Sequence, residues 1–319
     1  MVKQQLLRDK PYIFELEKTS YQPIFIMGLH RSGTTLLYEL LGKTGLFNIV
    51  TFYHAVHYEE LLSGYFEGTA QRTRQELNDW CAQRMETRLI DNVKFNADMP
   101  EEYAMILHAQ TRSVFLDKKT FPIFDQLCRK IQFVSNPVLP LLLKSPFDFS
   151  SFLQIKEMLP AAKFVFILRD PIQILNSQLK ALHTNLTVNN PAVNRLFRPY
   201  SFLHRIRPLV AVMRWATDPR SNGKLVRRFM MAKMKKQMYY YFNHIQQLPK
   251  TEYVVLHYEN LCAKPAETIN PIFALVGVQA CISNDFATHI CPRPFKLLPA
   301  LSRDEEEIRT EFKKIMSIK

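Results

Sequence analysis

Short apolar runs rich in β-branched and aromatic residues recur along the chain, and each is followed by polar or turn-forming residues. Runs of this kind are typical of strands that are buried on both faces in a parallel sheet. We expect such strands at residues 23–28, 138–144, 164–169 and 253–258.

Amphipathic segments with helical periodicity lie between these runs. We expect helices at residues 34–43, 71–90, 151–159, 171–183 and 266–276, in pieces through 205–247, and from about 303 onwards. Strands that alternate with helices predict an α/β fold, with a central parallel sheet flanked by helices.

No glycine-rich, serine-rich or proline-rich linker divides the chain, so we expect one domain over residues 1–319. Its core would comprise about 22–183 and 252–278, and a helical insertion would occupy about 184–250. A charged C-terminal helix would follow at about 303–319.

The composition is that of a globular protein, since 47% of the 319 residues are hydrophobic. The five cysteines are scattered and form no closely spaced pair, which favours reduced thiols and no structural metal site. The N-terminal region lacks the apolar core of a secretory signal, and no apolar run is long enough to span a bilayer. We therefore expect a soluble, cytoplasmic protein.

Positive charge is concentrated in one segment. The whole chain has a formal charge of +13, and residues 180–241 alone contain 13 basic residues and one acidic residue, or +12. One interpretation is a solvated helical face. The other is a surface that attracts an acidic acceptor, a polyanionic cofactor or an anionic surface.

The sequence GLHRSGTT at residues 28–35 follows a predicted strand and precedes a predicted helix. A glycine loop in this context directs backbone N–H groups and a helix N-terminus at an anion. The Walker pattern would have lysine where this chain has Thr34, and Arg31 supplies the cation instead. The loop therefore predicts a phosphate site poorly suited to phosphoryl transfer.

A second motif follows the strand predicted at 164–169. Arg169 ends that strand, and Ser177 lies eight residues later in the next helix. Ligands of open α/β sheets bind at the carboxyl ends of the strands, so Arg169 would be placed to meet a second anion.

The two motifs together resemble those of the sulfotransferases that use 3′-phosphoadenosine 5′-phosphosulfate (PAPS), in particular the bacterial and tyrosylprotein-type branch with a P-loop-like, three-layer fold. The resemblance implies that PAPS is the donor and adenosine 3′,5′-bisphosphate (PAP) the product, with no metal. It implies a 5′-phosphosulfate site made by Arg31, Ser32, Gly33, Thr34 and Thr35. It implies a 3′-phosphate site made by Arg169 and Ser177, with Lys296 as a further candidate.

The resemblance also implies an in-line displacement in which Arg31 and the strand-end Lys144 stabilise the reacting oxygens. The acceptor would be a hydroxyl, with an amine as second choice, on a small molecule or glycan.

A general base is needed for that reaction, and His54 is the favoured candidate, with Glu59 and His57 as alternatives. Glu101 and Glu102, in an acidic stretch that also resembles bacterial members, are weaker candidates. We expect Tyr258 and Glu259 to be structural.

Two other functions stay open at this point. A P-loop kinase acting on a small molecule would need to work without the Walker lysine. A non-enzymatic protein that binds nucleic acid or an anionic surface would use the basic segment at 180–241, in which aromatic residues are interleaved with the basic ones. No RNA-binding signature accompanies that segment.

Overall fold

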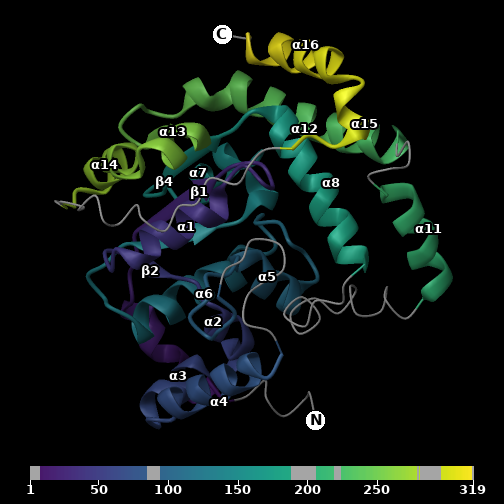
Figure 1. The fold of residues 1–319 in the computed structure, drawn as a ribbon. Helices are drawn as coiled ribbons and strands as arrows, with labels where there is room; N and C mark the ends of the chain where they lie inside the picture. The colour runs from purple at the N-terminus through teal and green to yellow at the C-terminus, as the bar shows by residue number, and fades with distance from the viewer. Residues whose placement is uncertain are drawn as a thin grey trace.

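A computed structural model describes residues 8–84, 94–187, 206–218, 224–278, 280 and 296–317. Within these residues, five strands form one parallel sheet (Figure 1). In spatial order the strands are β2 (Asn48–Ile49), β3 (Leu141–Lys144), β1 (Pro23–Met27), β4 (Lys163–Leu168) and β5 (Tyr253–His257). The four strands expected from the sequence are therefore confirmed, and β2 is an additional short edge strand.

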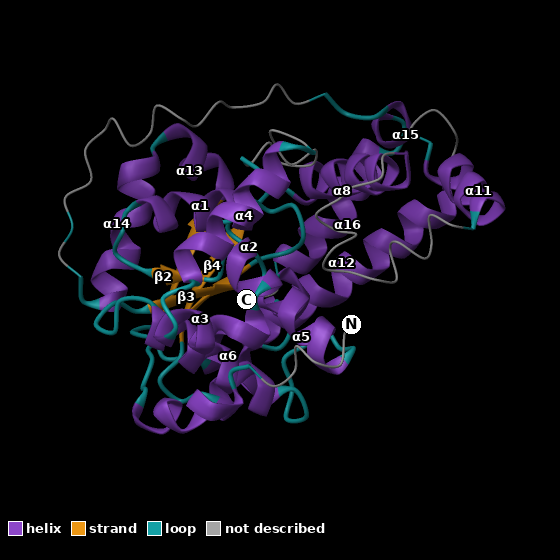
Figure 2. Cartoon of the chain, turned by 90° about the horizontal axis from the view of Figure 1, so that it is seen from below, coloured by secondary structure: helices purple, strands orange, loops and turns teal. Residues whose placement is uncertain are grey.

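Successive side chains of a strand point to opposite faces of the sheet, and apolar side chains pack on both faces. On β1, Ile24 and Ile26 pack into one apolar cluster, whereas Phe25 and Met27 pack into the other. The first cluster contains side chains of α1 (Thr34–Lys43) and α14 (Pro265–Val276). The second contains side chains of α6 (Phe121–Val134) and α12 (Lys224–His244). The result is a three-layer α/β arrangement, with helices above and below the sheet (Figure 2).

The other helical elements complete these layers and the surface around them. They are η2 (Lys10–Lys18), α2 (Phe52–Val56), η3 (Tyr58–Glu60), α3 (Leu61–Phe66), α4 (Ala70–Ala82), α5 (Tyr103–Thr111), η4 (Pro146–Asp148), α7 (Phe152–Met158), α8 (Pro171–Thr187), α11 (Arg207–Thr217), η5 (Ile245–Gln247), α13 (Tyr258–Ala263), α15 (Pro299–Ser302) and α16 (Glu305–Met316).

Most of the expected helices are present, with shifted ends. The helix expected at 71–90 is α4, and residues 85–93 lie outside the described part of the chain. Helices α5 and α6 were not predicted. None of the described helices has both the length and the apolar character needed to cross a bilayer.

Part of the basic segment packs against the acidic C-terminal helix. Helices α12 and α16 lie side by side (Figure 1). Arg227 and Lys235 of α12 form ion pairs with Asp304 and Glu311 respectively. Some of the concentrated positive charge is therefore neutralised within the molecule.

Candidate active site

The glycine loop between β1 and α1 is shaped by close approaches that exclude larger residues. A Cβ atom at Gly28 would lie 2.5 Å from the Ser32 hydroxyl oxygen and 2.9 Å from the Ile167 carbonyl oxygen. Gly33 has a φ of 104°, and a Cβ atom there would lie 2.3 Å from the Tyr258 ring. Both glycines are therefore required for the loop to take this path.

The loop ends where α1 begins at Thr34, so the positive end of the helix dipole lies at the loop. Arg31 has a φ of 73°, a left-handed conformation that is uncommon for a residue with a side chain. Backbone strain of this kind is frequent where a loop is arranged around a ligand.

The loop and the second motif come together at the carboxyl edge of the sheet. Because β1 and β4 are adjacent and parallel, the segments that follow them are neighbours. The Arg31 Nε atom donates to the Ser177 hydroxyl at 3.1 Å, and an Arg169 Nη atom donates to the Arg31 carbonyl at 3.0 Å. Gln178 donates to the His30 carbonyl at 2.8 Å. Residues more than 130 positions apart in sequence thus form one cluster.

Two buried donors in this cluster point to an anionic ligand. Arg169 is fixed by Gln173, at 3.1 Å, and by the Tyr258 ring, which lies 4.0 Å beneath its guanidinium group. Within the described residues, however, the Arg169 Nε and the Ser32 hydroxyl are buried without a hydrogen-bond partner. Unpartnered buried donors are costly in a folded protein, so these atoms fit a bound anion that accepts their hydrogen bonds.

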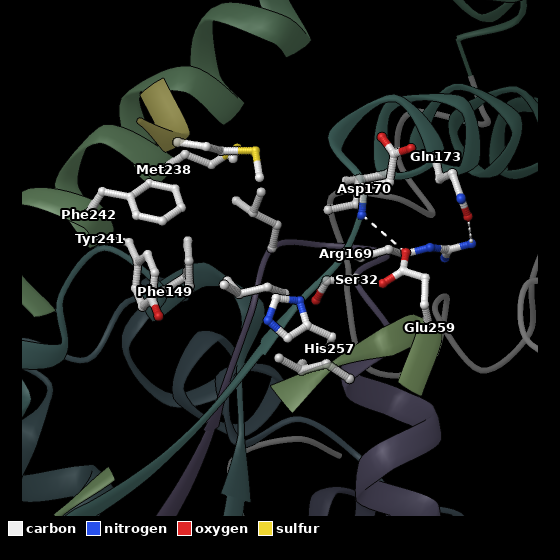
Figure 3. Close-up of a pocket in the computed structure, with 15 residues that line it drawn as sticks. Ser32, Phe149, Arg169, Asp170, Gln173, Met238, Tyr241, Phe242, His257 and Glu259 are labelled. Carbon is white, nitrogen blue, oxygen red and sulfur yellow. Dashed lines mark hydrogen bonds between the residues drawn. The ribbon is translucent and has the colours of Figure 1, made fainter. Parts of the chain in front are cut away.

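A cavity of about 250 Å³ lies against these donors. Its polar wall includes Ser32, Arg169, Gln173 and Glu259, and its apolar wall includes aromatic and methionine side chains (Figure 3). Its aromatic and methionine residues include Phe149, Met238, Tyr241 and Phe242, and aliphatic side chains such as Leu29 and Ile174 complete the apolar lining. A cavity with these two walls suits a ligand with a planar apolar part and an anionic part.

Lys144 ends β3 at the same edge of the sheet, since Lys144 is in register with Ile26 of β1. Its ammonium group lies 2.5 Å from a Glu102 carboxylate oxygen, and the two side chains are 5% and 17% exposed. Such a short, largely dry ion pair holds both charges in place.

His30, in the glycine loop, lies close to this ion pair. Burial lowers the pKa of His30 to about 4; Glu102 opposes that shift, and Lys144, Lys233 and Arg31 add to it. The imidazole is therefore neutral at pH 7, with both a carboxylate and cations near it.

His54, the favoured base from the sequence, has a different set of contacts. It lies in α2, where Thr51 and His54 form a reciprocal capping box. The Thr51 N–H donates to His54 Nδ1 at 3.2 Å, and the imidazole also hydrogen-bonds to the Ile49 carbonyl. Burial, with a smaller contribution from Arg74, lowers the pKa of His54 to about 3. The lone pair that a base needs is already used in capping the helix.

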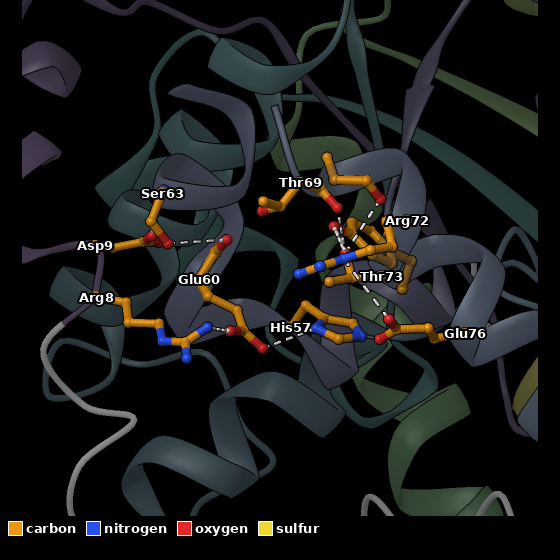
Figure 4. Close-up of polar contacts among 11 residues, drawn as sticks. Arg8, Asp9, His57, Glu60, Ser63, Thr69, Arg72, Thr73 and Glu76 are labelled. Atoms are coloured by element: carbon orange, nitrogen blue, oxygen red, sulfur yellow. Dashed lines mark hydrogen bonds and ion pairs between the residues drawn. The ribbon is translucent and has the colours of Figure 1, made fainter. Parts of the chain in front are cut away.

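The alternative bases also lie among other partners. His57 contacts a Glu60 oxygen at 2.9 Å, and Glu60 also binds Arg8 (Figure 4). Glu59 is in η3, next to Glu60. None of the contacts found for His57 or Glu59 among the described residues involves the glycine loop.

The remaining candidates lie near the cluster. The Lys296 carbonyl accepts hydrogen bonds from Asn176 and Lys180, so its backbone is adjacent to the turn of α8 that contains Ser177. Glu259 accepts a hydrogen bond from the Asp170 N–H at 3.3 Å and borders the cavity.

Two residues of this region were undervalued in the sequence. Glu102 was only a weaker candidate, because its pairing with Lys144 joins positions 42 residues apart. His30 was not singled out, because it occupies a variable position of the glycine loop pattern. No sequence signal would have located its neighbours.

Comparisons with known proteins identify a family and a similar fold. A family model described as "Sulfotransferase family" matches residues 23–207, more than half of the chain. The fold is similar to that of the sulfotransferase STF9 from Mycobacterium avium, with a TM-score of 0.67 at 13% identity over 98% of this chain and 81% of the other. It is also similar to that of the sulfotransferase STF1 from Mycobacterium tuberculosis H37Rv, with a TM-score of 0.58 at 14% identity and the same coverage. A comparison of the sequence with curated proteins gives no match.

Proposed function

The chain belongs to the sulfotransferase family, whose members take the sulfuryl group from PAPS and release PAP, and we propose that this site passes the group to a hydroxyl of a small molecule or glycan. An amine is the second choice of acceptor. Family membership decides against the kinase and against the non-enzymatic nucleic-acid protein. The fold is P-loop-like, as the sequence predicts, although the chain lacks the Walker lysine.

The observation that supports the proposal most is the meeting of the two anion-binding motifs with unpartnered donors between them. We assign the 5′-phosphosulfate to the glycine loop and the start of α1. The residues are Arg31, Ser32, Gly33, Thr34 and Thr35. We assign the 3′-phosphate to Arg169, Ser177 and, at the edge, Lys296, and the nucleoside to the cavity with the apolar wall.

Lys144 and Arg31 supply the positive charge that the transfer requires. The bound donor contributes an activated sulfuryl group, and negative charge grows on the oxygen that leaves it. A preorganised cation in a dry site stabilises such charge by about 3 kcal/mol. Glu102 holds Lys144 in place before the ligands bind.

For the general base we propose Glu102 rather than His54, Glu59 or His57. Its carboxylate is beside Lys144 and His30, whereas His54 already uses its Nδ1 lone pair to cap α2. When Lys144 turns from Glu102 to the reacting oxygens, the carboxylate loses its nearest cation and becomes a stronger base. Glu102 can then take the proton of the acceptor hydroxyl.

The role of Lys144 is tested by the rate of PAP formation from PAPS and a mixture of hydroxylated acceptors. Lys144→Met should reduce the rate by about a hundredfold or more, since one preorganised donor is lost. Donor affinity should change little. Lys118→Met is the matched control, because Lys118 is an exposed lysine in a surface ion pair with Glu157. Equal rates for the Lys144 and Lys118 variants would contradict the proposal.

The role of Glu102 is tested by the pH dependence of kcat/KM. Glu102→Gln should reduce kcat/KM by about a hundredfold and remove the loss of activity on acidification, because the amide does not titrate. A rate within twofold of the wild type, or an unchanged pH profile, would move the base elsewhere.

A further inference from the structure

A second cavity, of about 400 Å³, is lined in part by the loop residue His30. One wall is a face of α12, because Lys233, Lys236, Gln237 and Tyr240 occupy positions i, i+3, i+4 and i+7 of the helix and line the cavity together. The cavity is large enough for a small organic molecule.

The two lysines of this face differ from other basic residues of the same helix. Arg227 and Lys235 are paired with acids of the C-terminal region. Lys233 and Lys236 have no ion pair with any acid in the described residues. Two cations thus border the cavity with no acidic partner among the residues that the structure describes, so they attract an anion from solution.

Aromatic side chains outside α12 also line the cavity. Phe147, in the turn after β3, contacts His30 edge to face with ring centroids 4.8 Å apart. Phe115 contacts Phe147 in the same way at 6.2 Å, although half of Phe115 is exposed. Phe147 and Phe115 both line the cavity. Rings arranged in this way offer edges and faces to another aromatic ring.

The cavity is also adjacent to the groups assigned to the chemistry. His30 belongs to the loop assigned to the donor, and Pro146, which lines the cavity, lies two residues after Lys144. The positive charge of Lys233 contributes to the lowered pKa of His30, so this lysine also lies near the loop. A ligand here would meet the donor at the glycine loop.

We propose that this cavity is the acceptor site and that the acceptor is a hydroxylated aromatic compound with a carboxylate group. The ring packs on Phe147 and Phe115, and the carboxylate binds Lys233 and Lys236. The hydroxyl points towards Lys144. This inference rests on the proposed sulfuryl transfer for the step that follows binding, but binding itself can be measured without it.

The test compares two ligands that differ only in charge, 4-hydroxyphenylacetate and 4-hydroxyphenylacetamide, by calorimetric titration of the full chain saturated with PAP. The acid should bind at least about tenfold more tightly than the amide, as expected for charge-assisted hydrogen bonds. In the Lys233→Gln/Lys236→Gln double variant that preference should fall to about threefold or less. PAP affinity should not change.

Lys235→Gln is the matched control, since it removes the same charge from the same helix but faces α16. It should keep the preference for the acid. Equal binding of acid and amide, loss of the preference in Lys235→Gln alone, or no binding of either ligand would overturn the inference. If the acid binds as expected but is never sulfated, the result supports the proposed binding site and contradicts the proposed sulfuryl transfer.

Discussion

Replacing His54 by alanine separates a structural role from a catalytic one. The wild-type imidazole accepts the Thr51 N–H and is 5% exposed. Alanine leaves that buried N–H without a partner, which costs about 1–3 kcal/mol, and removes most of a buried side chain. We expect a total loss of about 2–4 kcal/mol in the free energy of unfolding.

The conservative variant His54→Asn sharpens the test. The asparagine side chain can offer an oxygen to the Thr51 N–H, as residues at helix N-termini commonly do, but it cannot act as a base near pH 7. It should recover at least half of the lost stability.

The assay combines urea unfolding, followed by circular dichroism, with the rate of PAP formation at a temperature where both variants are folded. We expect a kcat within about twofold of the wild type for both variants, as for residues outside the reacting groups. A hundredfold loss of kcat in both, with unfolding midpoints unchanged, would refute the capping role and restore His54 as the base.

Two further predictions concern pH and the loop. Burial holds the pKa of His54 at about 3 and that of His30 at about 4, below the ordinary 6.5, so the unfolded state takes up protons first as pH falls. Stability should therefore decrease below pH 6.5, by about 2 kcal/mol per histidine between pH 7 and pH 5, in urea titrations at each pH; no decrease would contradict the two neutral sites. Gly33→Ala should lower PAP affinity by about tenfold or more in calorimetric titrations, because its Cβ would collide with the Tyr258 ring; an unchanged affinity would show that the loop can relax.

The sheet was predictable because its strands are buried on both faces. Runs such as residues 164–168 are apolar at every position, which is the pattern of a central parallel strand. The edge strand β2 is only two residues long and gives no such pattern. Helix α5 was missed because it is apolar on most sides and shows little helical periodicity.

The meeting of the two motifs at one edge of the sheet was also predictable, since the glycine loop and Arg169 each follow a strand directly. Parallel neighbours place the ends of β1 and β4 together whatever the intervening sequence. The groups proposed as base and acceptor cavity could not be predicted, because they depend on tertiary contacts. No local sequence pattern shows that Lys144 pairs with Glu102. None shows that the face of α12 shared by Lys233 and Tyr240 lines a cavity.

The central claim is that the glycine loop and Arg169 together bind a nucleotide with both a 5′ group and a 3′-phosphate. It is tested most directly by calorimetric titration of the full chain with PAP, adenosine 5′-monophosphate and ATP with magnesium. We expect PAP to bind about 10- to 100-fold more tightly than the monophosphate, because its 3′-phosphate is held by charged donors. PAP should also bind more tightly than ATP. In Arg169→Ala the difference between PAP and the monophosphate should largely disappear, whereas the matched surface variant Arg72→Ala, which removes an exposed ion pair with Glu76, should retain it. Equal affinity for PAP and the monophosphate in the wild type, or a preference unchanged in Arg169→Ala, would contradict the account.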